Sequence, residues 1–469
     1  MKDKIRRRSF LRRSALSSML MGLTGLSLGA RTRSESPEAR LERLTSTRPA
    51  VGSPVIGMRD KPIEQVKVGV IGLGNRGSFH ARLLGNLYPD KAKVTAICDV
   101  RPERVEATLA ELKEKGQNPA TYSGDPDAWR EMVKRDDIDL IVVVTPWDLH
   151  TPMCVEGMRQ GKHVATEIPA ALTLEECWEL VNTSEETQRH CVMLENVCYG
   201  DEELWVLNMA QEGVFGTLTH AEAAYIHNLR EHMFSQDYYY NQWRIRFHEK
   251  IDANLYPCHG LGPVSQYLDI LRGDAYDTLV SMSSREASLT EVAKTVAPSN
   301  EFYGRTGFAH GDMNSSLIKT KQGRTILVQH DVVTPRPYSR INALGGTKGY
   351  HEGYPSRLAL EEHGHDWVPD EVYQEYREKY RHPIWETLKE GIEKNGGHGG
   401  MDFVMMYRLI DCLNNGWPVD MDVYDAAAWS AVVPLSRLSV EVGSAPVKFP
   451  DFSRGAWKEG RKLGIFAYM

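Results

Sequence analysis

The sequence has few cysteines, and they form no recognisable pattern. Seven cysteines are scattered along 469 residues, their number is odd, and no two of them form a Cys-x-x-Cys pair. A disulfide framework or a zinc site is therefore not indicated, and no bound metal is expected. Several of the cysteines lie in apolar runs, where they are expected to act as small buried hydrophobic side chains.

Strong charge of one sign and long apolar runs are lacking as well. The formal net charge is −7, with 25% charged and 41% hydrophobic residues, which is typical of a soluble globular protein. No long basic run follows the N-terminus, so nucleic acid is not an expected partner. The apolar stretch at residues 14–30 is short for a membrane span, and we expect no stable span in the mature protein. The length suits two domains.

The N-terminus predicts export. Residues 6–13 read Arg-Arg-Arg-Ser-Phe-Leu-Arg-Arg and precede the weakly apolar stretch, which is a signal-peptide pattern. The Arg-Arg-Ser-Phe-Leu part resembles a twin-arginine signal, a route that exports folded proteins. We therefore expect a signal peptide at 1–30, a linker at 31–62, and a periplasmic or extracellular protein. A basic disordered tail is the alternative interpretation.

A dinucleotide-binding fingerprint follows. Residues 68–77 read Val-Gly-Val-Ile-Gly-Leu-Gly-Asn-Arg-Gly, and Asp99 closes the next apolar run. In such a turn Gly72 permits the tight bend, Gly74 lets the backbone approach a pyrophosphate, and Gly77 allows helix and strand to pack closely. Asp99 lies where an acid binds the ribose hydroxyl groups of NAD. Arg101 follows Asp99 closely, so NADP stays an alternative to NAD as the cofactor.

Strand and helix patterns alternate from residue 66 onward. This alternation predicts an α/β protein whose N-terminal Rossmann domain, residues 63–198, holds a parallel sheet. After Tyr199 strand patterns cluster, which predicts a substrate-binding α+β domain at 199–469 on a largely antiparallel sheet. Expected strands are 66–71, 94–98, 140–144, 163–166, 191–194, 216–225, 278–282, 315–320, 324–331 and 338–344. Expected helices are 78–87, 102–115, 125–135, 153–160, 174–187, 202–211 and 402–414, and segment 425–440 is expected to return and brace the two halves.

Two loops end neighbouring strands at the edge where such sheets bind ligands. The run from Leu140 ends in Thr-Pro-Trp-Asp-Leu-His. Trp147 is therefore expected to line the nicotinamide-ribose side of the cofactor site, and His150 to form a hydrogen bond with a ribose or phosphate. A capping turn with a packed tryptophan is the alternative. The next strand ends in Glu167-Ile168-Pro169. The sequence thus directs two loops to one crevice.

This combination resembles the glucose–fructose oxidoreductase, inositol dehydrogenase and rhizopine catabolism superfamily. In its dehydrogenases the second loop reads Glu-Lys-Pro, and the lysine helps to deprotonate the alcohol that is oxidised. Here Ile168 stands in place of that lysine. The resemblance therefore does not favour a plain sugar dehydrogenase.

The remaining motifs resemble glycoside hydrolase family 109, the NAD-dependent α-N-acetylgalactosaminidases built on the same fold. The resemblance runs from Val66 to about Gly455 and includes the leader. It rests on Asn75-Arg76, the tryptophan turn, Glu167-Ile168, Glu195-Asn-Val-Cys-Tyr199, Asn254-Leu-Tyr-Pro-Cys-His-Gly-Leu-Gly-Pro263 and Gly397-His-Gly-Gly-Met-Asp402. Leu149 stands where the family is expected to have a second tryptophan.

The resemblance implies two sets of contact residues. Those expected to contact NAD, besides the three glycines, are Asn75, Arg76, Asp99, Trp147, Asp148, Leu149, His150, Glu167, Ile168, Asn196 and Tyr256. Those expected to line the sugar pocket are Tyr225, Arg244, Tyr256, Pro257, Cys258, His259 and Tyr338. Aromatic faces and an arginine fork suit a sugar with hydroxyl groups or an N-acetyl carbonyl. In contrast, His227, His248, His310 and His365 are expected to be surface or structural histidines.

The resemblance also implies a mechanism. Oxidation at sugar carbon 3 by NAD acidifies carbon 2; the glycosidic oxygen leaves by elimination; water adds, and reduction restores the cofactor. His259 is predicted as the leading acid/base, with Tyr256 as its partner on the same turn and Tyr199 as a further candidate. Which residue is the base stays open, and His259 only binding hydroxyl groups is an alternative.

The predicted function is hydrolysis of terminal α-N-acetylgalactosamine from a small-molecule or glycan substrate, with NAD recycled. The alternative is an exported NAD-dependent sugar or polyol dehydrogenase, and a third class is a non-catalytic sugar-binding protein. A homo-oligomer is possible.

Overall fold

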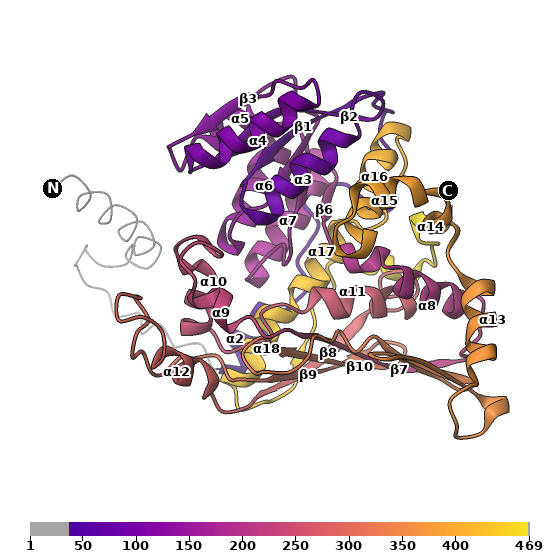
Figure 1. Ribbon diagram of the computed structural model, residues 1–469. Helices are drawn as coiled ribbons and strands as arrows, with labels where there is room; N and C mark the ends of the chain where they lie inside the picture. The colour runs from indigo at the N-terminus through magenta and orange to yellow at the C-terminus, as the bar shows by residue number, and fades with distance from the viewer. Residues whose placement is uncertain (1–36, 468–469) are drawn as a thin grey trace, which may run out of the picture. The chain divides into compact units, whose positions relative to one another are not determined.

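The computed structural model describes residues 37–467 (Figure 1). The predicted signal peptide, residues 1–30, lies outside this range. The chain divides into the units Met1–Leu41 and Glu42–Met469, and the second contains both sheets and the whole site. Within the described residues no helix is long and apolar enough to cross a membrane.

The first sheet is parallel and six-stranded, with the strand order β3-β2-β1-β4-β5-β6. This order is that of two mononucleotide-binding halves joined at β1 and β4, so the predicted Rossmann fold is confirmed. Its strands are β1 (Val66–Ile71), β2 (Ala92–Asp99), β3 (Ala120–Ser123), β4 (Leu140–Val143), β5 (His163–Thr166) and β6 (Cys191–Met193). The connecting helices are α3 (Asn75–Asn86), α4 (Pro102–Glu114), α5 (Trp129–Val133), α6 (His150–Arg159) and α7 (Leu174–Thr187). Every residue of β4 and β5 is buried, as expected for strands covered on both faces.

The second sheet has eight strands in the order β13-β12-β11-β7-β10-β9-β8-β14. All neighbouring strands are antiparallel except β7 and β10, which confirms the prediction of a largely antiparallel sheet. The strands are β7 (Leu218–Ile226), β8 (Tyr276–Ser283), β9 (Asn314–Thr320), β10 (Thr325–Asp331), β11 (Ala343–Gly346), β12 (Gly349–Gly353), β13 (Ser356–Leu360) and β14 (Val447–Lys448). Helix α11 (Cys258–Tyr267) packs on β7, and α18 (Val432–Glu441) packs on β8 (Figure 1).

Several shorter helices complete the second half. They are α8 (Asp201–Gln211), α9 (Arg230–Phe234), α10 (Trp243–Lys250), α12 (Ser288–Ala293), α13 (Asp370–Tyr380), α14 (Pro383–Thr387), α15 (Lys389–Asn395) and α19 (Gly464–Ala467). Helix α16 (Met401–Asn415) packs against α3, and α17 (Val423–Ser430) packs against α7 and β6. The C-terminal segments therefore return to brace the first half, as the sequence predicts.

Two expected elements differ from the structure. The expected strand 338–344 is broken because Ile341 and Asn342 adopt positive φ angles of 61° and 52°, so only Ser339 bridges to β7 before β11 begins. The expected helix 125–135 shortens to α5, because Asp125 accepts a hydrogen bond from the Asp127 N–H and forms a turn. Strands β3, β12, β13 and β14 were not predicted.

The end of the predicted linker 31–62 belongs to the second unit and packs there against α7 and α17. Val55 is 4% exposed, and its N–H donates to the Tyr424 hydroxyl group at 3.2 Å. A Cβ atom on Gly52 would lie 2.3 Å from the Glu185 carbonyl oxygen. Helix α2 (Pro37–Thr45) precedes this segment.

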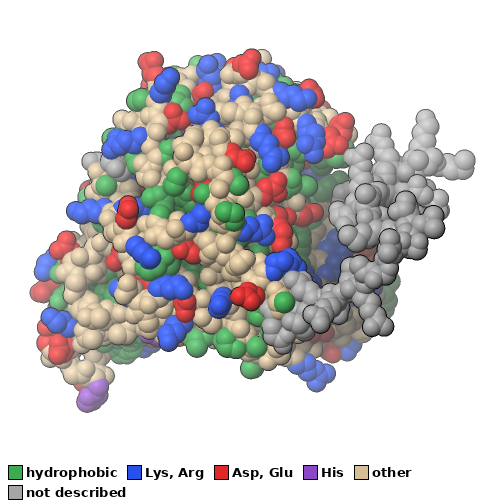
Figure 2. Space-filling model, turned by 180° about the vertical axis from the view of Figure 1, so that it is seen from behind, with side chains coloured by type: hydrophobic (Ala, Val, Ile, Leu, Met, Phe, Trp, Pro, Cys, Tyr) green, Lys and Arg blue, Asp and Glu red, His purple; other side chains and the backbone are tan. Residues whose placement is uncertain are grey.

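Basic and acidic side chains are interspersed on the face drawn in Figure 2, without a field of one sign. This distribution agrees with the small net charge of the sequence.

Candidate active site

The turn between β1 and α3 is shaped by close backbone approach. Gly72 has a φ angle of +88°, and a Cβ there would lie 2.4 Å from the Val144 carbonyl oxygen. A Cβ on Gly77 would lie 1.7 Å from the Gly72 carbonyl oxygen. Only Gly74 faces open space, since its Cβ would meet nothing nearer than Arg101 at 3.7 Å. The turn therefore leaves room on the side where the predicted pyrophosphate approaches.

Helix α3 begins at this turn and presents unpaired backbone donors. Its first intrahelical bond runs from the Ser78 N–H to the Gly74 carbonyl oxygen, so the N–H groups of the preceding turn have no helical acceptor. Asp99 ends β2 beside them and is 7% exposed. Its carboxylate accepts from Leu73 N at 2.6 Å, from Arg101 N at 2.9 Å and from Arg101 Nε at 3.2 Å. A carboxylate has about four acceptor positions, so capacity for one ribose hydroxyl group remains.

A loop of the second half touches this turn. The side chain of Asn75 donates to the Tyr238 carbonyl oxygen at 3.5 Å, and the Arg101 guanidinium lies 4.5 Å from the ring centroid of Tyr240. The predicted cofactor residues and the second half of the chain thus meet directly at the carboxyl end of the parallel sheet.

Arg76 joins two buried carboxylates. Its guanidinium bonds Asp402 through two contacts of 2.9 and 3.1 Å and Glu167 at 3.1 Å. Asn196 and His398 donate to the same Asp402 carboxylate, each at 2.7 Å, and His80 lies 2.7 Å from Glu167. Burial alone raises the pKa of Glu167, but the charge of Arg76 and the His80 hydrogen bond hold it well below its usual range. Asp402 behaves in the same way.

The tryptophan turn has two kinds of side chain. Trp147 is 3% exposed and packs against Trp243, Phe247 and Tyr256, whereas Asp148 and Leu149 are exposed. Both ring nitrogens of His150 lie 2.8 Å from backbone carbonyl oxygens, those of Pro169 and Thr145. His150 therefore holds the two strand-end loops together, and its own contact with a cofactor stays a prediction. Ile168 is 2% exposed.

His259 stands at the start of α11 and is oriented by a carboxylate. Its Nδ1 lies 2.8 Å from Oε1 of Glu195, whose side chain is fully buried, while the His259 side chain is 17% exposed. The same Glu195 oxygen accepts the Val197 N–H at 3.0 Å. Because the carboxylate accepts the Nδ1 proton, the neutral ring carries its lone pair on Nε2. The structure therefore presents an imidazole backed by a buried carboxylate.

An aromatic cluster surrounds a buried arginine beside this imidazole. We define the cluster as Trp147, Tyr225, Tyr239 and Tyr256; their ring centroids lie 5.0, 6.0, 5.4 and 4.8 Å from Cζ of Arg244. Arg244 is 5% exposed, and its Nη1 donates to the Tyr239 hydroxyl group at 3.2 Å. Its Nε and Nη2 atoms are buried without a hydrogen-bond partner among the described residues. Such donors are costly to leave unpaired, so they point to a ligand acceptor.

Tyr225 and Tyr256 connect the cluster to His259. The Tyr225 ring lies 4.6 Å from that of Tyr256 and 5.3 Å from that of His259, and Tyr256 lies 5.1 Å from His259. Burial raises the pKa values of both tyrosines. The Tyr338 ring is 6.3 Å from Tyr225, and its hydroxyl group accepts from Arg340 at 2.9 Å. The structure thus gathers most of the predicted sugar-binding residues around one point.

Two predicted residues, Tyr199 and Cys258, have side chains engaged elsewhere. The Tyr199 hydroxyl group donates to Asp420 at 3.0 Å, in a buried pair with Arg408. The Cys258 thiol is fully buried and lies 3.9 Å from the Met193 sulfur, and Pro257 precedes α11. Contacts of these residues with cofactor or sugar stay predictions.

Glu195 and Asp402 were not predicted as functional residues. Both lie within the motifs that carry the family resemblance, but their partners are far away in the sequence, so spacing alone could not reveal the contacts. The histidine expected to be structural, His227, also belongs to this site, because its Nδ1 lies 3.1 Å from the Tyr225 hydroxyl oxygen.

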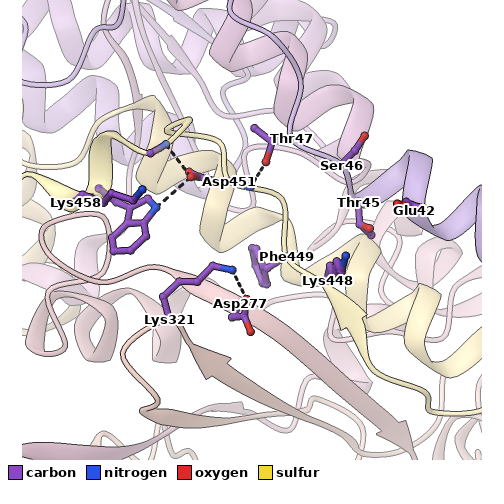
Figure 3. A pocket seen from close by; sticks show the side chains of 12 residues that line it. Glu42, Thr45, Ser46, Thr47, Asp277, Lys321, Lys448, Phe449, Asp451 and Lys458 are labelled. Carbon is purple, nitrogen blue, oxygen red and sulfur yellow. Dashed lines mark hydrogen bonds and ion pairs between the residues drawn. The ribbon is translucent and has the colours of Figure 1, made fainter.

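A recess of about 610 Å³ lies away from these residues (Figure 3). It is lined by Glu42, Thr45, Ser46, Thr47, Asp277, Lys321, Lys448, Phe449, Asp451, Gly455, Trp457 and Lys458, none of which is a predicted site residue. Its polar groups are largely paired with one another: Asp451 accepts from Trp457 Nε1, and Lys321 pairs with Asp277. Size does not identify the site here; the gathered acid/base and cofactor residues do.

Comparisons with known proteins agree with this geometry. Residues 199–459 match the model of the glycosyl hydrolase 109 C-terminal domain, and residues 66–195 match an oxidoreductase family with an NAD-binding Rossmann fold. The chain belongs to glycosyl hydrolase family 109. It is accordingly an NAD-dependent glycoside hydrolase.

Curated relatives match nearly the full length of this chain. A glycosyl hydrolase family 109 protein from Shewanella sp. (strain W3-18-1) is 46% identical over 98% of this chain and 99% of its own. An alpha-N-acetylgalactosaminidase from Shewanella oneidensis is 44% identical over the same shares.

Solved structures share the fold at low identity. Levoglucosan dehydrogenase in complex with NADH has a TM-score of 0.60 at 15% identity, covering 82% of this chain and 100% of its own. The WlbA dehydrogenase from Bordetella pertussis, in complex with NADH and UDP-GlcNAcA, has a TM-score of 0.57 at 17% identity, covering 83% and 99%.

Proposed function

We propose that this enzyme releases terminal α-N-acetylgalactosamine by an oxidation–elimination–addition–reduction cycle in which NAD is recycled. The observation that carries the proposal is the carboxylate-backed His259 beside the aromatic cluster and the unpaired donors of Arg244. The name of the Shewanella oneidensis relative supports the choice of sugar. The N-terminal arginine pattern supports export by the twin-arginine route.

The residues at the parallel sheet fit NAD. The open side of Gly74, the free first-turn N–H groups of α3 and the remaining acceptor capacity of Asp99 suit a pyrophosphate and a ribose. Bound NAD supplies the reversible oxidation of a sugar carbon. The other proton movements fall to side chains of this chain.

His259 is placed to act as the base at carbon 2. Its Nε2 lone pair is available because Glu195 accepts the Nδ1 proton, and that carboxylate stabilises the imidazolium formed when a proton is taken. After exchange with solvent, return of a proton from His259 to carbon 2 in the addition step restores the neutral ring. Arg244 is placed to donate its Nε and Nη2 hydrogens to the acetamido carbonyl oxygen, which distinguishes N-acetylgalactosamine from galactose.

Ile168 separates this proposal from a dehydrogenase. The resemblance places a lysine there in sugar dehydrogenases, whereas here a buried isoleucine offers no proton acceptor. The carbon 3 hydroxyl proton must therefore leave through another group, and it returns to the sugar when the hydride is given back.

The test uses the purified full-length enzyme without added NAD. A chromogenic α-N-acetylgalactosaminide carrying deuterium at carbon 2 should be cleaved over many turnovers, with loss of the deuterium and no accumulation of NADH. Cleavage with full retention of the label would exclude the elimination route. Stoichiometric NADH without release of the aglycone would instead establish a dehydrogenase. The corresponding α-galactoside, which lacks the acetamido group, is the matched substrate control.

A further inference from the structure

A loop from the second half of the chain lies against the glycine turn of the first. We define the tyrosine loop as residues 235–242, which join α9 to α10 and contain Tyr238, Tyr239 and Tyr240 in succession. The Tyr238 carbonyl oxygen accepts a hydrogen bond from the side chain of Asn75, the first residue of α3, at 3.5 Å. The loop thus reaches the helix start at which the pyrophosphate is expected.

The base of the tyrosine loop is fixed in the protein interior. Gln242 is fully buried, and its Nε2 donates to the Phe234 carbonyl oxygen at 2.8 Å and to Oδ1 of Asn300 at 3.0 Å. Asn241 and Gln242 have positive φ angles of 55° and 52°, a conformation that persists only where the surroundings specify it. The tyrosines therefore project from a fixed base toward the glycine turn.

The tyrosines at the tip are ordered by neighbours and still keep exposed surface. Tyr238 stacks on His232 with the ring centroids 3.9 Å apart and an angle of 8° between the planes. The ring of Tyr240 lies over the guanidinium of Arg101, with Cζ 4.5 Å from the ring centroid. Tyr238 is 45% exposed and Tyr240 is 42% exposed. Part of each ring is thus left open beside the turn.

Arg101 connects this loop to the open side of the glycine turn. Its side chain is 15% exposed, and its Nε donates to Oδ1 of Asp99 at 3.2 Å. A Cβ atom on Gly74 would lie 3.7 Å from Nη2 of Arg101, so that nitrogen borders the space that Gly74 leaves free. A guanidinium held in this way is a strong donor to phosphate oxygens. Asp99 on one side and Tyr240 on the other fix its position.

We propose that the tyrosine loop is part of the cofactor site, and that Tyr240 retains NAD on the glycine turn by holding Arg101 in place. Tyr240 is a positioning residue here, because it acts through the arginine. A guanidinium that is already ordered loses less freedom when it binds a phosphate, so the bound state is favoured. The inference rests on NAD binding by the Rossmann fold and is independent of the course of the sugar chemistry.

The experiment uses nucleotide-stripped full-length protein and two probes. Displacement of NADH by excess NAD, followed by fluorescence, gives the dissociation rate, and calorimetric titration with ADP-ribose gives an affinity without the nicotinamide. Tyr240→Leu should raise the NADH dissociation rate by about 3- to 30-fold and weaken ADP-ribose binding by a similar factor. Tyr240→Phe keeps the face of the ring and should stay within about 2-fold of the unmodified protein on both measures.

A double-mutant cycle tests whether Tyr240 acts through Arg101. Arg101→Met removes a charge-assisted bond and should weaken ADP-ribose binding by about 10- to 150-fold. Adding Tyr240→Leu to Arg101→Met should then weaken binding by less than about 2-fold more, because the residue that Tyr240 holds is already gone. Tyr303→Leu, at a tyrosine that is 51% exposed and lies outside the loop, is the matched control.

The outcomes separate this inference from a structural role and from the proposed function. An unchanged NADH dissociation rate in Tyr240→Leu would overturn it. So would a loss that is as large in the Arg101→Met background, together with a lower free energy of urea unfolding of the nucleotide-free protein. If the unmodified enzyme shows the expected nucleotide binding but cleaves no α-N-acetylgalactosaminide, the proposed function fails while this inference stands.

Discussion

The cofactor end and the sugar end of the site handle charge in opposite ways. At the cofactor end Arg76 has two carboxylate partners, and Asp402 also receives Asn196 and His398. At the sugar end Arg244 has aromatic rings around it and two donors without partners. The charges of the first end are satisfied within the protein, whereas those of the second are left for a ligand.

This difference suggests that the cofactor end contributes mainly to folding stability and the sugar end mainly to the reaction. A buried cation with its carboxylates in place fixes the relation of the glycine turn, the Glu167 loop and α16, and breaking it is costly. Unpaired donors and a neutral imidazole lower stability but can form bonds with a substrate that changes charge during the reaction. We therefore expect substitutions at the sugar end to change turnover, and those at the cofactor end to change folding and NAD retention.

The largest effect is expected from His259→Ala. A positioned acid/base contributes about 10²- to 10⁴-fold, so kcat should fall by that factor while NAD content after gel filtration stays unchanged. Steady-state release of the chromogenic aglycone and nucleotide release on denaturation measure the two quantities. His365→Ala, at an exposed position, serves as the control. Parallel loss of activity and NAD would show that His259 only supports the fold.

Arg76→Met is expected to act on stability. It leaves Glu167 and Asp402 buried without their shared cation, and breaking such a pair costs about 3–5 kcal/mol of unfolding free energy. Urea unfolding in excess NAD measures this. Combining Arg76→Met with Glu167→Gln and Asp402→Asn should recover much of the loss, and a triple variant as unstable as the single one would contradict the pairing argument.

The ion-paired group of Arg76, Glu167 and Asp402 also predicts how the free energy of unfolding falls at low pH. The folded pKa values of both carboxyl groups are held below their unfolded values of about 4.3 for Glu and 3.9 for Asp. Their contribution is therefore fully present above about pH 4.5 and is lost as the pH falls through the folded values. The triple variant should lose less unfolding free energy than the unmodified protein between about pH 4.5 and pH 3.

A smaller effect is expected from Asp99→Ala. Loss of a charge-assisted bond to the ribose costs about 1.5–3 kcal/mol, which corresponds to about 10- to 150-fold weaker NAD binding. Calorimetric titration of nucleotide-stripped protein measures it, and Asp90→Ala, at an exposed position, is the control. Unchanged affinity would place the ribose elsewhere.

The smallest effect is expected from Tyr338→Phe. The Tyr338 side chain is 41% exposed, and its hydroxyl group is bonded to Arg340, so loss of one neutral hydrogen bond to the sugar costs about 0.5–1.5 kcal/mol. KM should rise by about 2- to 10-fold with kcat nearly unchanged. A large fall in kcat would move Tyr338 into the proton-transfer machinery.

Elements with a strong local pattern were predictable from the sequence. The bounds of β1, β5 and α7 match the expected ones. Apolar residues predominate in β1 and form the middle of β5, and Thr173 with Glu176 forms a capping box at the start of α7. Strands β12 and β13 were missed because their residues are mostly half-buried and lack a clear alternation. The break after Ser339 depends on two left-handed residues that no local pattern indicates.

The site residues also divide into those that a local sequence pattern predicts and those that meet only in the folded chain. Gly72, Asp99 and the strand-end loops could be placed because parallel strands bring their carboxyl ends to one edge. Glu195 meets His259 across 64 residues of sequence, and Asp402 meets Arg76 across 326, so those contacts exist only once the chain has folded. The 3.1 Å contact between His227 and Tyr225 was likewise not indicated by the sequence, which assigned Tyr225 to the sugar alone.

Burial of every cysteine gives the molecule a set of internal reporters. All seven thiols are unpaired and buried, and burial raises the pKa of the Cys98 thiol to about 12. Since the thiolate is the reactive form, an alkylating reagent meets almost none of it in the folded enzyme. Cys98 lies in β2, Cys258 in α11 and Cys412 in α16, so the order in which these positions become alkylated records which part of the molecule opens first.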